Sequence, residues 1–149
     1  MTSSETPLRA QTGNLCVVCG PGHPHGLRLR FEIAPSGDAS APWTPTADWE
    51  GFRGVIHGGI VSTVLDEAMS KAVAALPAEA FTAELRVRFR RHVASGSPYL
   101  IRGWVVERRK RHITAEAALT TPDGVEHAHA WATFLAPAPS PSYTSFSGE

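Results

Sequence analysis

The chain has 149 residues, a length that suggests one domain, and 42% of them are hydrophobic, which is enough to form a core. Its 14 basic and 14 acidic residues balance, so the composition argues against a nucleic-acid partner. The sequence has no apolar run near the roughly 20 residues of a membrane-spanning helix and no signal-peptide pattern at its start, so we expect a cytoplasmic protein without a membrane partner. Two cysteines are too few for a disulfide scaffold.

The two ends of the chain differ in composition from its middle. Residues 1–13 are polar, and residues 137–149 are rich in Pro and Ser. Such segments lack the apolar periodicity of packed elements, and we expect two flexible tails around a domain at residues 14–136.

A small cluster of potential metal ligands lies at the start of this domain. Cys16 and Cys19 are followed by His23 and His25, an arrangement that resembles half of a zinc site. The four ligands would have to come from ten residues, a tighter spacing than usual. Two reduced cysteines that pack a loop are therefore the preferred interpretation.

The next segment has the period of a strand. Apolar residues alternate with charged ones over residues 27–33, which predicts a half-buried strand. A turn is expected at residues 35–38, and residues 39–49 are compatible with a further short strand.

Residues 58–75 have the clearest helical pattern, and Pro77 is expected to stop the helix. Only three charged residues, Asp66, Glu67 and Lys71, lie in it, which indicates a helix surrounded by other structure. Lys71 follows Glu67 by four residues, the favourable order for an ion pair, so we interpret Glu67 as structural.

Strand-like segments then fill the rest of the domain. One helix followed by a run of antiparallel strands predicts an α+β domain. A basic link at residues 108–111 separates two of these segments, and a Pro-Asp-Gly turn separates the last two. The expected strands are residues 83–89, 99–107, 112–121 and 125–135.

The start of the helix carries the most informative motif, His57-Gly58-Gly59, with Asp66 nine residues after the histidine. Glycines allow close backbone approach, and N–H groups at a helix N-terminus stabilise negative charge. A carboxylate about two turns further on could activate a water, and these two groups are the minimum for hydrolysing an acyl group. A solvent-exposed Asp66 and a His57 that only fixes the loop are the alternatives.

Three segments together resemble the acyl-CoA thioesterases of the hotdog-fold superfamily, in the branch with the phenylacetate-pathway and THEM-type enzymes. They are the Cys-x-x-Cys-Gly segment at 14–27, the motif at 54–69 and the strand at 81–93. The resemblance implies a curved antiparallel sheet wrapped around one long central helix at about 58–75. It also implies a homodimer or a dimer of dimers, a homotetramer, that binds acyl-CoA at the dimer interface.

The resemblance further implies roles for single residues. Asp66 would act as general base or nucleophile, and the backbone N–H of Gly58 would polarise the thioester carbonyl. His57 and Gly59 would complete the same turn, with Gly59 close to the substrate. Thr82 would position the water, and no metal or organic cofactor would be required.

Two further positions bear on substrate binding. The basic residues Arg109, Lys110 and Arg111 are candidates for binding the CoA phosphates, although a solvated hairpin turn would have the same composition. Some relatives have a polar residue six positions before the histidine, where this chain has Gly51. The carbonyl would then be held by the backbone alone or by another residue.

Three other functions remain open. A non-catalytic acyl-CoA-binding hotdog protein would keep the groove without turnover. A hotdog enoyl-thioester hydratase or dehydratase pairs Asp with a catalytic His at other spacings, so the spacing of His57 and Asp66 favours a thioesterase. A zinc-stabilised structural module would be built on Cys16 and Cys19.

Overall fold

The computed structural model describes residues 15–77 and 79–137. Apart from Pro137, the two expected tails lie outside the described residues. No helix in the described ranges is long and apolar enough to cross a membrane. In chain order the elements are β1 (Glu32–Ile33), β2 (Ala39–Trp43), the 3-10 helix η1 (Ala47–Trp49), α2 (Gly58–Ala74), β3 (Phe81–Phe89), β4 (Tyr99–Arg109), β5 (His112–Thr120) and β6 (Glu126–Leu135).

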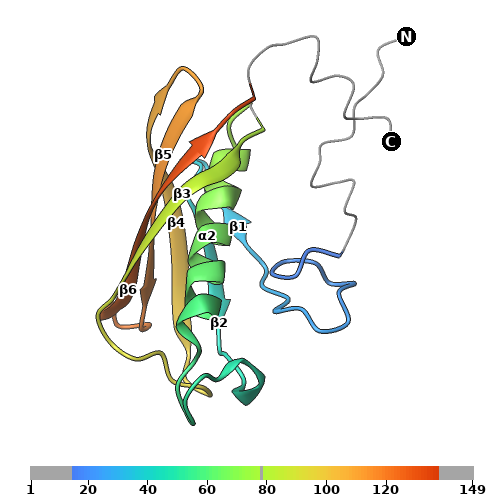
Figure 1. Ribbon diagram of the computed structural model, residues 1–149, viewed down its shortest axis with the longest axis vertical. Coiled ribbons are helices and arrows are strands. Elements are labelled where there is room, and N and C mark those ends of the chain that lie inside the picture. The colour runs from blue at the N-terminus through green and yellow to red at the C-terminus, as the bar shows by residue number, and fades with distance from the viewer. Residues whose placement is uncertain (1–14, 78, 138–149) are drawn as a thin grey trace.

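The strands form one six-stranded sheet in the order β1-β2-β4-β5-β6-β3, and every pairing is antiparallel. Helix α2 runs along one face of this sheet (Figure 1). The α+β class predicted from the sequence is confirmed, and the predicted helix agrees with α2 to within one residue.

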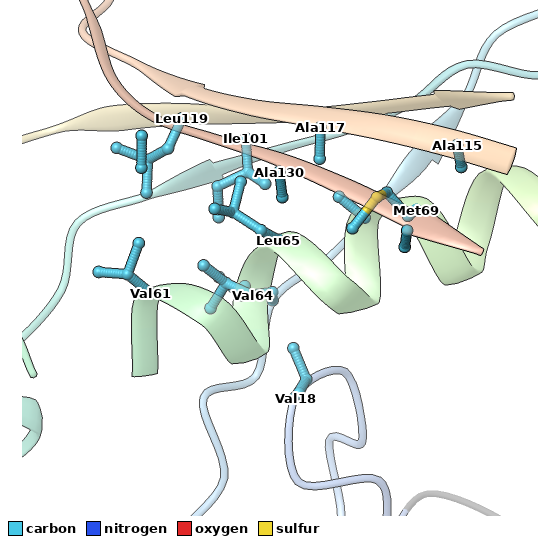
Figure 2. Packing of buried hydrophobic residues seen from close by; sticks show 14 of the residues in the cluster. Val18, Val61, Val64, Leu65, Met69, Ile101, Ala115, Ala117, Leu119 and Ala130 are labelled. Atoms are coloured by element: carbon cyan, nitrogen blue, oxygen red, sulfur yellow. The ribbon is translucent and has the colours of Figure 1, made fainter. Parts of the chain in front are cut away.

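Small residues on the sheet allow the helix to pack closely. Leu65 and Met69 of α2 are fully buried and point toward alanines of β5 and β6, as Figure 2 shows. At Gly103 of β4 a Cβ atom would lie 2.4 Å from the backbone carbonyl of Ala68. Only glycine therefore allows α2 to cross β4 at this distance.

The strand expected at residues 27–33 is much shorter than predicted, since β1 covers only its last two residues. Arg28 has a φ of 56°, a left-handed conformation that interrupts an extended chain. The neighbouring N–H groups bond to the cysteine-containing loop instead of to a strand. Leu27 donates to Val17 O and Leu29 to Val18 O, both at 2.8 Å.

Strand β3 is a long edge of the sheet. Among the described strands it pairs only with β6, and eight of its nine residues are exposed. Three large apolar residues contribute to this exposure: Phe81 is 51%, Leu85 37% and Phe89 52% exposed. An unpaired edge that exposes large apolar side chains is a template for pairing with another strand.

Candidate active site

His57 caps the N-terminus of α2. Its Nδ1 accepts a hydrogen bond from the Gly59 N–H at 2.9 Å, and its own N–H donates to Trp49 O at 2.9 Å. A Cβ at position 59 would lie 3.0 Å from the same Nδ1, so glycine permits this contact. The geometry agrees with a histidine that fixes the turn.

The Gly58 N–H has a different environment. Gly58 is the first residue of α2, and the first N–H groups of a helix have no partner within it. The Gly59 N–H is taken by His57, whereas the Gly58 N–H is free of that bond. An N–H group at this position of a helix can stabilise a negatively charged group.

An open cavity of about 600 Å³ adjoins this helix start. Its walls come from the loop before α2, from Gly58 and from the residues at the end of β3. Phe52, which is 84% exposed, and Phe89 give it apolar walls, and His92 adds a polar one. Sequence reasoning missed these three residues. Phe89 was predicted only as the last residue of the strand at 83–89, and no sequence signal pointed to Phe52 or His92.

Asp66 and Thr82 form the second part of the site. The Thr82 hydroxyl donates a hydrogen bond to Asp66 Oδ1 at 2.7 Å, which links the middle of α2 to the start of β3. Asp66 is half-buried, and Thr82 is exposed. The pairing of β3 with β6 shifts register between Thr82 and Glu84. Such a bulge changes which side chains face the helix and brings Thr82 to Asp66.

The two parts of the site are well separated within one chain. Gly58 and Asp66 are eight residues apart in α2, which corresponds to about 12 Å along the helix axis. Phe89, next to Gly58, and Thr82, next to Asp66, are likewise seven residues apart on β3, or roughly 23 Å. One protomer thus presents two half-sites, one at His57–Gly59 and one at Asp66 with Thr82.

Gly51 packs closely against His57. A Cβ there would lie 3.3 Å from both Cα and Cδ2 of His57, so a larger residue would require the histidine to shift by a few tenths of an ångström. The neighbouring Glu50 carboxylate accepts hydrogen bonds from the Gly54 N–H and the Ser95 hydroxyl, both at 2.8 Å. Glu50 thereby fixes the loop before α2.

The basic residues chosen for CoA phosphates lie at the β4–β5 hairpin. Arg109, Lys110 and Arg111 are exposed, and Arg111 Nε donates to Ala136 O at 2.9 Å. The strand register places this hairpin beside Phe81, at the opposite end of β3 from Gly58. Within one protomer the structure does not bring the hairpin to the helix start.

The Cys-Cys-His-His set considered for zinc is not assembled. The sulfur atoms of Cys16 and Cys19 instead lie within 4.8 Å of each other and of a carboxylate oxygen of Glu67, and neither His23 nor His25 belongs to this group. The predicted ion pair in α2 is confirmed, with Lys71 Nζ at 3.8 Å from Glu67 Oε1.

Sequence comparison identifies the family. The model of the thioesterase superfamily matches residues 53–128, just over half of the chain. The chain belongs to the thioesterase superfamily. The match includes both half-sites, from His57 to Thr82. Among curated proteins none matches the chain significantly.

Solved structures of this superfamily share the fold. One described as a thioesterase superfamily protein has a TM-score of 0.77 and 25% identity, with 80% of this chain and 62% of that chain covered. This chain therefore spans less than two thirds of that protein. PaaI from the phenylacetic acid degradation operon of E. coli has a TM-score of 0.70 and 17% identity, with 75% and 81% covered. The predicted hotdog fold is confirmed.

A third similar structure was solved with a ligand. It is a hypothetical thioesterase protein with coenzyme A from Streptococcus pneumoniae, with a TM-score of 0.69, 16% identity, and 74% of this chain and 86% of that chain covered. A hypothetical thioesterase from the same organism was also solved as two variants, in which an Asp and a Thr sixteen positions later are each replaced by Ala.

Proposed function

We propose that the protein is an acyl-CoA thioesterase, which hydrolyses a thioester to a free acid and CoA. The observation that carries this proposal is the 2.7 Å hydrogen bond between Thr82 and Asp66 in a chain of the thioesterase superfamily. Thr82 follows Asp66 by sixteen residues, the spacing of the Asp and Thr replaced in the Streptococcus thioesterase. The coenzyme A in a similar structure supports the substrate class.

Asp66 acts as the general base in this mechanism. Its carboxylate takes a proton from a water molecule, and the water oxygen attacks the thioester carbonyl carbon. The Thr82 hydroxyl donates to Asp66 and keeps its lone pairs for the water, so it can hold both groups in line. When the C–S bond breaks, the CoA thiolate leaves and takes the proton that Asp66 accepted, which restores the carboxylate. Direct attack by Asp66 is the nucleophilic variant of this scheme.

The Gly58 N–H stabilises the oxyanion that forms on the carbonyl oxygen. The helix N-terminus adds its partial positive charge, and a preorganised donor of this kind commonly contributes about 100-fold or more to the rate. His57 and Gly59 hold the turn through their mutual hydrogen bond. The site needs no metal or organic cofactor for these steps.

A second copy of the chain completes the site. Because Gly58 and Asp66 are about 12 Å apart along one helix, they cannot act on the same carbonyl within one protomer. If two copies pair their β3 edges antiparallel about a two-fold axis near the strand centre, Thr82 of one copy lies opposite Phe89 of the other. Asp66 then faces the partner's Gly58.

The same arrangement explains the distant basic hairpin. When the two β3 strands pair antiparallel, the Phe81 end of β3 in one copy lies beside the Phe89 end of β3 in the other. The partner's hairpin, with Arg109, Lys110 and Arg111, then lies on the side of the Gly58 cavity and can bind the CoA phosphates. We propose a homodimer as the smallest active unit, and pairs of dimers can form a tetramer.

Thiol release from a panel of acyl-CoAs tests the proposed reaction. We expect the wild type to hydrolyse at least one member, and Asp66→Asn to lower kcat at least about 100-fold, because the amide cannot accept the proton from water. Asp38→Asn, which neutralises a carboxylate on a turn away from the site, serves as the matched control and should retain activity.

Two other outcomes would contradict the proposal. Acyl-CoA binding without hydrolysis of any panel member would identify a binding protein, and the lack of a side-chain donor at Gly51 would be the first explanation. Addition of water to a 2-enoyl-CoA would identify a hydratase instead. This reaction is measured as the loss of absorbance of the conjugated double bond.

A further inference from the structure

The N-terminal loop packs on the side of α2 that faces away from the sheet. Figure 2 shows Val18 across the helix from the strands, and Val18 is 3% exposed. This loop contains Cys16 and Cys19, and it contributes no residue to either half-site. Its chemistry is therefore independent of the proposed function.

Three potential metal ligands converge where the loop meets the helix. The sulfur atoms of Cys16 and Cys19 and one carboxylate oxygen of Glu67 all lie within 4.8 Å of one another, and all three residues are half-buried. In a tetrahedral zinc site with sulfur and oxygen ligands, the ligand atoms are roughly 3.6–3.8 Å apart. Side-chain shifts of about 1 Å would thus bring these atoms to bonding distance from one ion.

The backbone of the loop is folded to present both sulfur atoms. The Cys19 N–H donates to Cys16 Sγ at 3.4 Å, and the Gly20 N–H donates to Cys16 O at 2.8 Å. The second bond closes a turn that places the two side chains together. The first holds Cys16 Sγ next to the backbone of Cys19.

The ligand set selects among metals. Two thiolates favour zinc and other thiophilic ions over magnesium or calcium, which prefer oxygen ligands. Zinc binds cysteine as the thiolate, so zinc binding releases protons and strengthens as the pH rises.

We propose that Cys16, Cys19 and Glu67 bind one zinc ion that fastens the N-terminal loop to α2. Water occupies the fourth coordination position, so the site has one protein ligand fewer than most structural zinc sites. Lys71, which lies 3.8 Å from Glu67, lies near enough to offset part of the negative charge of two thiolates and a carboxylate. The ion would stabilise the packing of the loop and does not enter the hydrolysis.

Zinc analysis of the purified full chain tests this site. We expect about one zinc per chain after reconstitution and a rise in the Tm when zinc is added to the stripped protein. Cys16→Ser and Glu67→Gln should each weaken zinc binding at least about 100-fold, since even partners outside the ligand shell cost 10- to 100-fold. His25→Gln is the matched control, because His25 lies in the same loop and does not belong to the ligand group, and it should leave zinc binding unchanged.

A spectroscopic measurement on the wild type keeps the test independent of how the variants fold. Cobalt added to the stripped chain should produce charge-transfer absorption from two thiolates. The proposal is overturned if the reduced wild type takes up neither metal, or if binding survives the loss of Cys16 or Glu67. A disulfide between Cys16 and Cys19 in protein purified without reductant, with no metal uptake after reduction, would also overturn it.

Discussion

At the scale of single residues, one hydrogen bond distinguishes the two N–H groups at the start of the helix. His57 accepts a hydrogen bond from the Gly59 N–H, and the neighbouring Gly58 N–H is the proposed donor to the oxyanion. The backbone of position 58 can therefore be tested without disturbing the histidine. His57 has a ψ of 132°, which suits the residue before a proline, and proline is favoured in the first position of a helix.

Gly58→Pro should remove the oxyanion donor and keep the helix. We expect kcat to fall about 100-fold or more because the N–H is lost, with a small change in Tm. Gly58→Ala keeps the N–H and places a Cβ about 3.4 Å from Phe89, an ordinary contact, so it should retain most activity. Steady-state hydrolysis of the best acyl-CoA measures both, and equal losses would show that bulk rather than the N–H matters.

At the scale of elements, the contact between α2 and β4 positions both half-sites. The helix approaches the sheet so closely at Gly103 that a methyl group would meet the backbone of Ala68. Ala68 lies two residues after Asp66, so this contact sets the height of the carboxylate above the sheet. Backbone atoms cannot move aside as a flexible side chain can.

Gly103→Ala should destabilise the protein by about 1–3 kcal/mol, the usual cost of overpacking a core. Urea unfolding followed by circular dichroism measures this free energy. Arg108→Ala, on the exposed end of the same strand, should change it by less than about 0.5 kcal/mol. If Gly103→Ala were as mild as this control, the helix would have more freedom than the structure shows.

At the scale of the whole molecule, the proposed site needs two copies of the chain. One half-site holds Gly58, the other holds Asp66, and the exposed edge of β3 lies between them. A dimer that combines a Gly58→Pro copy with an Asp66→Asn copy would have one intact site and one site with both defects.

Mixed dimers purified through two different affinity tags should recover about half of the wild-type activity, since one of the two sites is intact. Dimers of either variant alone should remain at least about 100-fold less active than the wild type. Thiol release per dimer is the measurement. Mixed dimers as inactive as their parents would mean that both groups act within one chain.

Local patterns in the sequence were sufficient for most of the fold. The periods of α2 and of the four strands after it depend on residues close in the chain, so their positions are readable without a structure. The same is true of the Glu67–Lys71 pair, which needs only the geometry of a helix. The prediction of a strand at 27–33 was wrong for its first five residues. Arg28 adopts a left-handed conformation, and the backbone N–H groups of its neighbours donate hydrogen bonds to the cysteine-containing loop.

By itself, the sequence determined the helix, the order of the strands along the chain and the His57-Gly58-Gly59 turn, because these follow from residue spacing. Only the tertiary structure decided which distant side chains meet. A register shift in β3 brings Thr82 to Asp66, against the simple alternation of the strand. Packing of the N-terminal loop on α2 likewise brings Cys16 and Cys19 to Glu67. Such contacts join segments far apart in the chain, so the periodicity of apolar residues within one segment cannot predict them.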